Sequence, residues 1–245
     1  MASDVKLHDA PKMGCMGCAV RGLGFCRFSL DQGLEAARAD TPQVAQVERV
    51  APARRPIFRA SDRIDGLPVI CAGWSAVVAY LPNGRRQILS FPLPGEFISS
   101  SLVFADVPFR DVEAVTPVHY RSFDRTTVRQ HMTIRPGLFE RLFKDCITEK
   151  ERLEELAIDL GRRSAEERVA RLILDLTERL AKHDLQRGST IDFPLRQTQI
   201  ADALGLTPVY TNQVLRKFHN SGILKIVGRT LTVLDPLKLS LLANR

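Results

Sequence analysis

The spacing of apolar side chains divides the chain into a segment of short strands followed by a segment of helices. Between residues 50 and 134, short apolar runs such as LPVICAGWSAVVAYL and RQILSFPLPGEFI are interrupted by glycine and proline. The dipeptide Asn83-Gly84 lies between two such runs and predicts a β-hairpin. Several short strands at this spacing favour a small antiparallel barrel or roll.

After Arg135-Pro136-Gly137 the apolar residues recur at helical spacing, and a long helix is predicted to start there. Its stripe recurs at alternating spacings of three and four residues over three heptads and consists of Phe139, Leu142, Cys146, Glu149, Leu153, Leu156 and Leu160. Only Glu149 is at odds with an apolar seam. So narrow a stripe suits contact between two helices, so the prediction is a dimer; a helix packed on its own domain is the alternative.

Farther along the chain, the pattern predicts a second amphipathic helix and then a helix-turn-helix. Ser164 and Glu167 form a capping box at the start of the amphipathic helix, and a strand is expected over Ile191–Leu195. The helix-turn-helix covers Ala201–Asn220, with a first helix over Gln197–Leu204. Small residues at the crossing of two helices, followed by a capped helix, are typical of this motif.

The second helix of that motif carries side chains suited to reading base edges. Gly205 would supply the turn, Thr207 the N-cap and Pro208 the first helical residue. The residues predicted to face DNA are Val209, Tyr210, Asn212, Gln213 and Arg216, with Lys217 nearer the backbone. Asn and Gln can each bond adenine through two contacts, so an A·T-rich half-site is expected. A β-hairpin with Arg229 at its tip is expected to follow this helix. Lying beside the helix as the wing of a winged helix-turn-helix, it would add phosphate contacts.

The distribution of charged residues also places DNA binding in the C-terminal part of the chain. The chain has a net charge of +7, and residues 161–245 hold 14 Lys and Arg against 8 Asp and Glu. Lys and Arg gain affinity for nucleic acid by releasing counterions from it. No phosphate loop, zinc-protease, nucleophile-elbow or paired-carboxylate motif is present, so an enzyme is not expected. No apolar run is long enough to cross a membrane and no secretory signal precedes the strands, so we expect a cytoplasmic protein.

The order of roll, dimer helix and winged helix-turn-helix resembles the Crp/Fnr superfamily of bacterial regulators. The sequence segments that carry the resemblance are CAGWSAVVAYLPNGRRQILSFPLPGEFI, RRSAEERVARLILDL and ALGLTPVYTNQVLRKFHNSGIL. The resemblance implies an α+β protein divided into a cysteine-containing segment (1–30), a β-roll (31–134), a dimerisation helix (135–161) and a DNA-binding domain (162–245). It also implies RNA polymerase as a partner and a palindromic operator bound by a homodimer.

Members of the superfamily differ in the signal that they sense, and residues of the roll indicate which signals this chain could sense. The roll lacks the carboxylate that a cyclic-nucleotide sensor uses for the ribose, having Ser99-Ser100-Ser101 instead, and only Arg110 could serve a phosphate. Cyclic AMP is therefore not favoured. Val209, Asn212 and Gln213 also replace the Glu and Ser-Arg of Fnr-type recognition helices, so the usual Fnr operator is not expected.

The N-terminal cysteines point to a different signal. Cys15, Cys18 and Cys26 resemble the cluster of Fnr/FnrN-type oxygen sensors, which implies an iron–sulfur cluster of the 4Fe-4S type. Cys71 is the preferred fourth ligand, and His119 is the alternative. A zinc site, direct thiol oxidation or a small-molecule ligand in the roll would also be compatible with a Crp/Fnr regulator. A metal or ligand scaffold without DNA binding is the remaining alternative.

Overall fold

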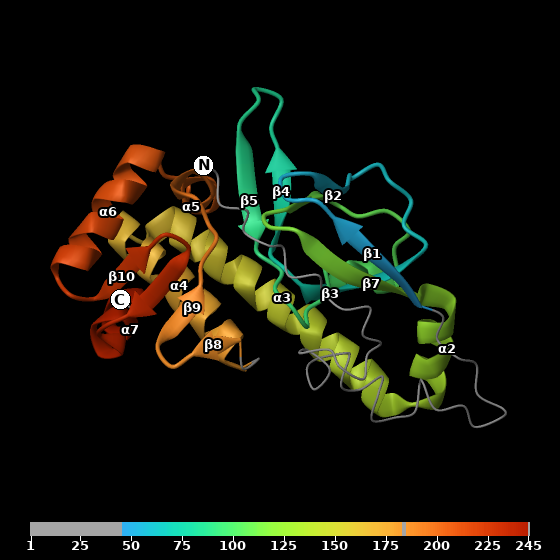
Figure 1. Cartoon of the computed structure of the whole chain (residues 1–245). Coiled ribbons are helices and arrows are strands. Elements are labelled where there is room, and N and C mark those ends of the chain that lie inside the picture. The colour runs from blue at the N-terminus through green and yellow to red at the C-terminus, as the bar shows by residue number, and fades with distance from the viewer. Residues whose placement is uncertain (1–45, 183–184, 245) are drawn as a thin grey trace, which may run out of the picture.

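The chain forms a β-roll and a helical C-terminal unit that lie along one long helix (Figure 1). A computed structural model describes residues 46–182 and 185–244. The cysteine-containing segment expected over residues 1–30 therefore lies outside the described residues. None of the described helices is both long and apolar enough to span a membrane.

The roll consists of two antiparallel sheets, one with three strands and one with four. The first has the order β1-β7-β3 and the second the order β2-β6-β4-β5. The strands are β1 (Gln46–Ala51), β2 (Pro56–Phe58), β3 (Gly66–Ala72), β4 (Ser75–Tyr80), β5 (Arg86–Ser90), β6 (Asp111–Ala114) and β7 (Val118–Asp124). The hairpin predicted from Asn83-Gly84 joins β4 to β5, with Gly84 at a φ of 79° and the Asn83 side chain accepting from the Arg85 amide.

Two helices follow the roll, and the sequence pattern predicted only the longer one. The short helix α2 (Arg125–Ile134) begins at Asp124, whose carboxylate accepts a hydrogen bond from the Thr127 amide. The long helix α3 (Pro136–Arg162) starts where the pattern placed it. Between β5 and β6 lies a short 3₁₀ helix, η2 (Ser100–Val103).

The C-terminal unit is a helical core with a four-stranded sheet of order β10-β11-β9-β8. Its elements are α4 (Ala165–Lys182), β8 (Gln186–Arg187), β9 (Thr190–Asp192), α5 (Gln197–Leu204), α6 (Pro208–Asn220), β10 (Leu224–Val227), β11 (Thr230–Val233) and α7 (Pro236–Ala243). The capping box is confirmed, because Ser164 and Glu167 each accept from the other's amide. The strand expected over Ile191–Leu195 ends early, at Asp192, ahead of Pro194, which has no amide hydrogen for a ladder.

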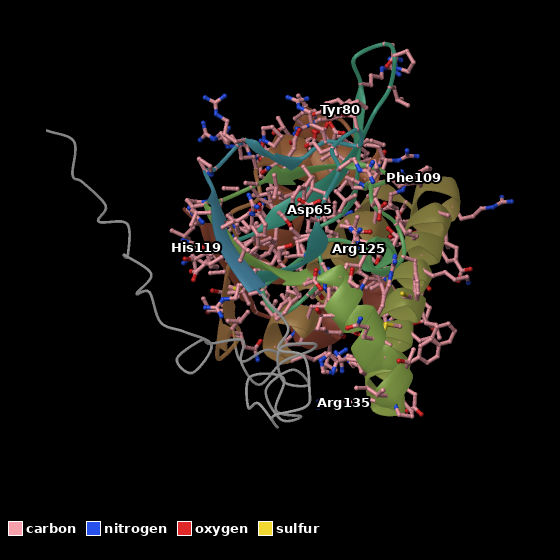
Figure 2. The ribbon with its side chains drawn as sticks, turned by 90° about the vertical axis from the view of Figure 1, so that its right-hand side faces the viewer. Asp65, Tyr80, Phe109, His119, Arg125 and Arg135 are labelled. Carbon is pink, nitrogen blue, oxygen red and sulfur yellow. The ribbon has the colours of Figure 1, made fainter. Side chains whose placement is uncertain are left out.

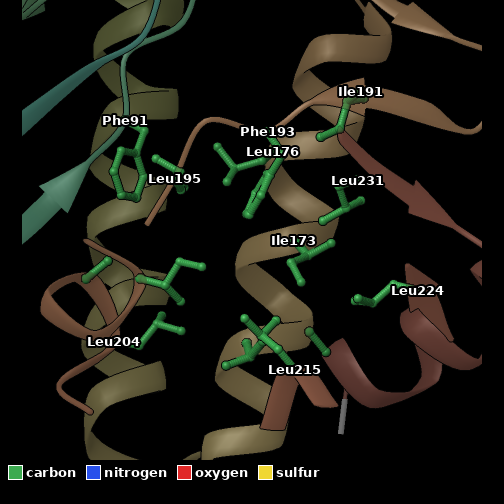
Figure 3. Packing of buried hydrophobic residues seen from close by; sticks show 14 of the residues in the cluster. Phe91, Ile173, Leu176, Ile191, Phe193, Leu195, Leu204, Leu215, Leu224 and Leu231 are labelled. Atoms are coloured by element: carbon green, nitrogen blue, oxygen red, sulfur yellow. The ribbon is translucent and has the colours of Figure 1, made fainter. Parts of the chain in front are cut away.

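One hydrophobic cluster joins the roll to the C-terminal unit. Trp74 and Phe91 of the roll belong to the same buried cluster as Ile173 and Leu176 of α4. The rings of Trp74 and Phe193 meet edge to face at 6.3 Å between centroids. Figure 3 shows this packing, with Phe91 beside Leu195. The position of the helix-turn-helix is therefore set partly by the roll.

Candidate nucleic-acid interface

The second helix of the helix-turn-helix is held rigidly by its cap and its buried face. Thr207 caps α6, since its hydroxyl accepts from the Tyr210 amide at 3.2 Å. Gly205 forms the turn at a φ of 64°, a left-handed conformation that glycine adopts without strain. The buried face consists of Thr211, Val214, Leu215 and Phe218, which recur at helical spacing. The opposite face is thereby fixed in orientation.

That opposite face presents most of the residues predicted to read DNA. Val209 is 70% exposed and Tyr210 47% exposed, and Gln213 and Arg216 are exposed as well. Asn212 is half-buried, and its side-chain oxygen accepts from the Gln197 side chain at 3.0 Å. Gln197 therefore orients the Asn212 amide so that its nitrogen remains available as a donor.

The remaining predicted contacts lie beside α6. Arg229 is at the tip of the β10–β11 hairpin and lies 3.4 Å from Asp192, with both side chains 61% exposed. An ion pair so exposed contributes little to stability, so Arg229 can exchange its partner for a phosphate. Lys217 contacts Glu166 of α4 at 2.6 Å. The Lys217 side chain is 63% exposed, so it too can exchange Glu166 for a phosphate.

The roll holds the first helix of the motif through side chains that sequence reasoning missed. Arg86 of β5 contacts Asp202 of α5 at 2.6 Å and Glu113 of β6 at 3.2 Å. The neighbouring Gln87 side chain donates to the Ala203 carbonyl at 2.8 Å. Asp202 and Ala203 lie 116 residues after Arg86 and Gln87, so no local pattern could have identified these two contacts.

A buried ion pair forms the second attachment of the roll to the C-terminal unit. Arg179 of α4 is 5% exposed and donates to both carboxylate oxygens of Glu96 and to the Phe91 carbonyl. Asp175 and Arg152 extend the network. Burial raises the pKa of the Glu96 carboxyl, but the Arg179 guanidinium more than offsets this, and the pKa lies below its ordinary value. Glu96 is therefore ionised in the folded protein at neutral pH.

The residues of the predicted dimer seam on α3 lie in two different environments: some contact the roll of their own chain, and others are exposed. Leu142 is only 2% exposed and packs in the cluster under the roll with Leu138 and Leu67. Glu149 accepts hydrogen bonds from the amide and hydroxyl of Ser100 in η2. These two residues face their own roll, which corrects their assignment to a dimer seam. Phe139 and Leu153 are exposed, and Cys146, Leu156 and Leu160 are partly exposed.

The roll and α3 enclose a cavity of about 580 Å³, whose lining includes Glu96, Arg110 and Glu149. The Ser100 amide and hydroxyl already donate to Glu149, so the loop offers hydroxyls and a carboxylate from α3. Arg110 has its Nε buried without a partner among the described residues, and its guanidinium lies 4.0 Å over the Phe109 ring. Its neighbour Asp111 accepts from the Ala60 amide. A guanidinium and two carboxylates thus line the cavity, and both carboxylates already have partners, Glu96 in Arg179 and Glu149 in Ser100.

The two alternative fourth ligands lie on the neighbouring strands β3 and β7, and His119 pairs with Ala72, the residue after Cys71. Cys71 occupies a bulge of β3 between the pairs Ile70–Tyr120 and Ala72–His119. Both Cys71 and His119 are partly exposed, and Figure 2 places His119 at the edge of the roll. Within the described ranges, no group of three or more His, Cys, Asp or Glu side chains could hold a metal. Cys15, Cys18 and Cys26 lie outside those ranges.

Comparison with known proteins agrees with this architecture. Residues 48–134 match the cyclic nucleotide-binding domain, and residues 167–242 match the Crp-like helix-turn-helix domain. Transcriptional activatory protein AadR of Rhodopseudomonas palustris is 29% identical over 226 residues, covering 92% of this chain and 91% of the relative. Nitrogen fixation regulation protein FixK of Bradyrhizobium diazoefficiens is 27% identical over 235 residues, covering 94% and 93%.

A solved structure supports the same fold. FixK2 from Bradyrhizobium japonicum superposes with a TM-score of 0.75 at 24% identity, covering 82% of this chain and 99% of that structure. A roll, a long helix and a helix-turn-helix in this order define a class of regulators that bind DNA. The chain belongs to the Crp/Fnr family of transcription regulators. It is a DNA-binding regulator and not an enzyme, as the sequence predicted.

Proposed function

We propose that the chain binds a palindromic operator as a homodimer, with α6 in the major groove and the β10–β11 hairpin against the backbone. The observation that carries this proposal is the exposed polar face of a capped helix whose other face is fully buried. Gln213 and Arg216 extend from that face without a salt bridge to any described acidic residue. A rigid helix of this kind can place two or three side chains against base edges.

The proposed readers differ in what they contribute. Asn212 and Gln213 can each bond adenine, Val209 can contact a thymine methyl, and Arg216 can bond guanine or a phosphate. Tyr210, Lys217 and Arg229 would contact the backbone and fix the position of the helix. This set favours an A·T-rich half-site.

The dimer seam is proposed along the exposed side of α3. Phe139 and Phe143 stack at 5.9 Å between ring centroids, and Phe143 is 55% exposed. Ile147 and Leu153 continue the exposed apolar side of the helix. Two such helices side by side would bury this stripe, together with the outward parts of Cys146, Leu156 and Leu160.

A binding experiment tests the proposal. DNA selected by the protein from a random duplex pool is titrated in fluorescence anisotropy against wild type, Gln213→Ala, Arg216→Ala and, as a control of equal charge change, Lys144→Ala on α3. We expect Gln213→Ala to lose about 1–3 kcal/mol of discrimination at one base position. If neither α6 variant changes binding, or if no sequence is enriched, the proposed interface is wrong.

We further propose that the signal is oxygen or redox state, sensed through cysteine. The support is the resemblance of Cys15, Cys18 and Cys26 to the Fnr/FnrN cluster, together with a partly exposed thiol at Cys71, next to Ala72, which pairs with His119. Four such residues could hold a 4Fe-4S cluster, which supplies oxygen-sensitive redox chemistry when bound. Zinc, or oxidation of the thiols themselves, is the alternative.

Metal analysis separates these readings. The full chain is purified without oxygen, and iron, acid-labile sulfide and zinc are measured in wild type, Cys71→Ala and, as a matched thiol control, Cys146→Ala. Loss of iron in Cys71→Ala but not in Cys146→Ala would support Cys71 as a ligand, whereas His119→Ala tests the alternative. A protein without iron or sulfide would contradict the cluster.

Two finer assignments follow from the family. We propose RNA polymerase as the protein partner at the promoter and the cytoplasm as the location, since transcription regulators act where the DNA and the polymerase are. Pull-down of RNA polymerase with the DNA-bound protein tests the first assignment.

A further inference from the structure

A large groove lies between the roll and the C-terminal unit and opens beside the proposed recognition helix. Its volume is about 1220 Å³. We call it the basic groove, because its charged lining consists of Arg54, Arg86, Arg196, Arg216, Arg229, His219 and the single acid Glu113. It exceeds the 300–1,000 Å³ typical of small-molecule pockets and so suits a larger, extended anion.

Most of the positive charge in the basic groove is not neutralised by the described acids. Glu113 and Asp202 both pair with Arg86. Arg54, Arg196 and Arg216 are exposed and make no salt bridge with a described acidic residue. Three exposed guanidinium groups on the lining of one groove make its potential positive, so the groove favours a polyanion.

Arg54 holds its place in a backbone conformation that is costly for arginine. Its φ is 63°, and within the described residues it is the only residue other than glycine with a positive φ. The loop is clamped to β6, because the Arg54 amide donates to the Ala114 carbonyl at 2.7 Å and the Ala114 amide donates to the Arg55 carbonyl at 2.9 Å. Glycine adopts this conformation without strain, so an arginine here adds a backbone cost that its side chain does not relieve by any described salt bridge.

We propose that the roll loop Ala53–Pro56 is a second DNA-contact element, in which Arg54 binds a backbone phosphate of the operator flank, outside the half-site contacted by α6. This inference rests on the proposed function. The same groove lining contains Asn212 and Arg216 of α6 and Arg229 of the hairpin, so a duplex held by α6 passes the mouth of the groove. The successive phosphates of a duplex can contact several arginines of one groove, which a single small anion cannot.

The test compares two duplexes with the same selected site, one ending at the outer edges of the half-sites and one extended by arbitrary sequence on both sides. Binding of the full-length protein is measured by anisotropy over a range of KCl concentrations. Arg54→Gly removes the charge and keeps the left-handed turn, so the fold is maintained, and Arg54→Lys restores the charge. Arg59→Gln removes an equal charge from an exposed turn of the roll outside the groove.

Wild type is expected to bind the extended duplex more tightly than the short one. Arg54→Gly should lose this gain, and its salt slope on the extended duplex should fall by about 1.8, which is about 0.9 for one phosphate per subunit of a dimer. Arg54→Lys should recover the gain and Arg59→Gln should keep it. Arg54→Gly should retain the thermal midpoint of wild type or exceed it.

Three results would overturn the inference. Equal affinity of wild type for both duplexes would show that the flank is not contacted. Equal losses in Arg54→Gly and Arg59→Gln would show a diffuse charge effect in place of a groove contact, and a loss on the short duplex alone would place Arg54 at the half-site. Failure of the proposed function is distinguishable, because then neither duplex would respond to Arg216→Ala.

Discussion

Replacing Arg179 by methionine is expected to destabilise the protein strongly, because it removes the cation from a buried ion pair. Arg179 donates to Glu96, to Asp175 at 2.8 Å and to the Phe91 carbonyl at 2.6 Å. Methionine keeps much of the side-chain volume, so the change isolates charge and hydrogen bonding. Glu96, whose side chain is 17% exposed, would be left without its main partner.

The expected loss follows from what remains around Glu96. Breaking a buried pair by removing one partner costs about 3–5 kcal/mol. Arg152 still lies 3.4 Å from Glu96 and would partly compensate. We therefore expect Arg179→Met to lower the free energy of unfolding by about 3 kcal/mol. Adding Glu96→Gln removes the stranded charge, so the double variant should be more stable than Arg179→Met alone.

The same pair predicts the dependence on pH. The pKa of Glu96 is below its ordinary value in the folded protein, so its stabilisation is present above the unfolded pKa and is lost as pH falls through the folded pKa. Without Arg179, burial would raise the pKa of Glu96, and protonation on acidification would then relieve the variant. The stability difference between wild type and variant should therefore be largest at neutral pH and smaller near pH 4, which lies below the unfolded pKa.

Urea unfolding followed by circular dichroism at pH 7 and pH 4 measures both quantities. Glu96→Gln and the double variant complete the thermodynamic cycle. The reasoning is refuted if Arg179→Met unfolds at the wild-type urea midpoint, or if the difference is the same at both pH values.

Three further predictions concern the cap, the seam and the roll cavity. Thr207→Ala should cost about 0.5–2 kcal/mol, because α6 loses the acceptor for the Tyr210 amide; urea unfolding measures it, with Thr198→Ala as a control on the exposed side of α5. Phe143→Glu should shift the chain from dimer to monomer in analytical ultracentrifugation, and a dimer of unchanged strength would contradict the seam. Cyclic AMP should leave the thermal midpoint unchanged, whereas binding at a hundredfold excess over Kd would stabilise by about 2.7 kcal/mol.

The DNA-binding end of the chain could be predicted from sequence almost to the residue. Helices α5 and α6 have the predicted bounds, because their signals are local: Gly205 at the turn, Thr207 at the cap and Pro208 at the first helical position. The buried positions of α6 follow from helical spacing alone. Propensity, capping and periodicity agree here, which is when sequence reasoning is most reliable.

The long helix shows where such reasoning fails. A heptad stripe gives the apolar side of a helix but not the identity of what packs against it. In α3 the roll covers Leu142, and Ser100 of η2 donates a hydrogen bond to Glu149. One part of the predicted stripe therefore packs on the roll, and the other part is exposed. The short helix α2 was missed for a related reason, since Arg125 is buried by bonds to the Leu102 and Ile64 carbonyls, which lie far away in sequence.

The connection between roll and C-terminal unit also suggests how a signal at Cys71 could reach the DNA. The preceding residue, Ile70, accepts from the Gly95 amide and donates to the Glu96 carbonyl, in both cases through its backbone. The Glu96 carboxylate in turn holds Arg179 of α4, which packs with α6 in the shared core. A change in the β3 bulge would therefore move the partner of Arg179 through two hydrogen bonds. If this route carries the signal, Arg179→Met should bind DNA with the same affinity in oxidised and reduced protein, and a variant that still responds to redox state would show that the coupling runs elsewhere.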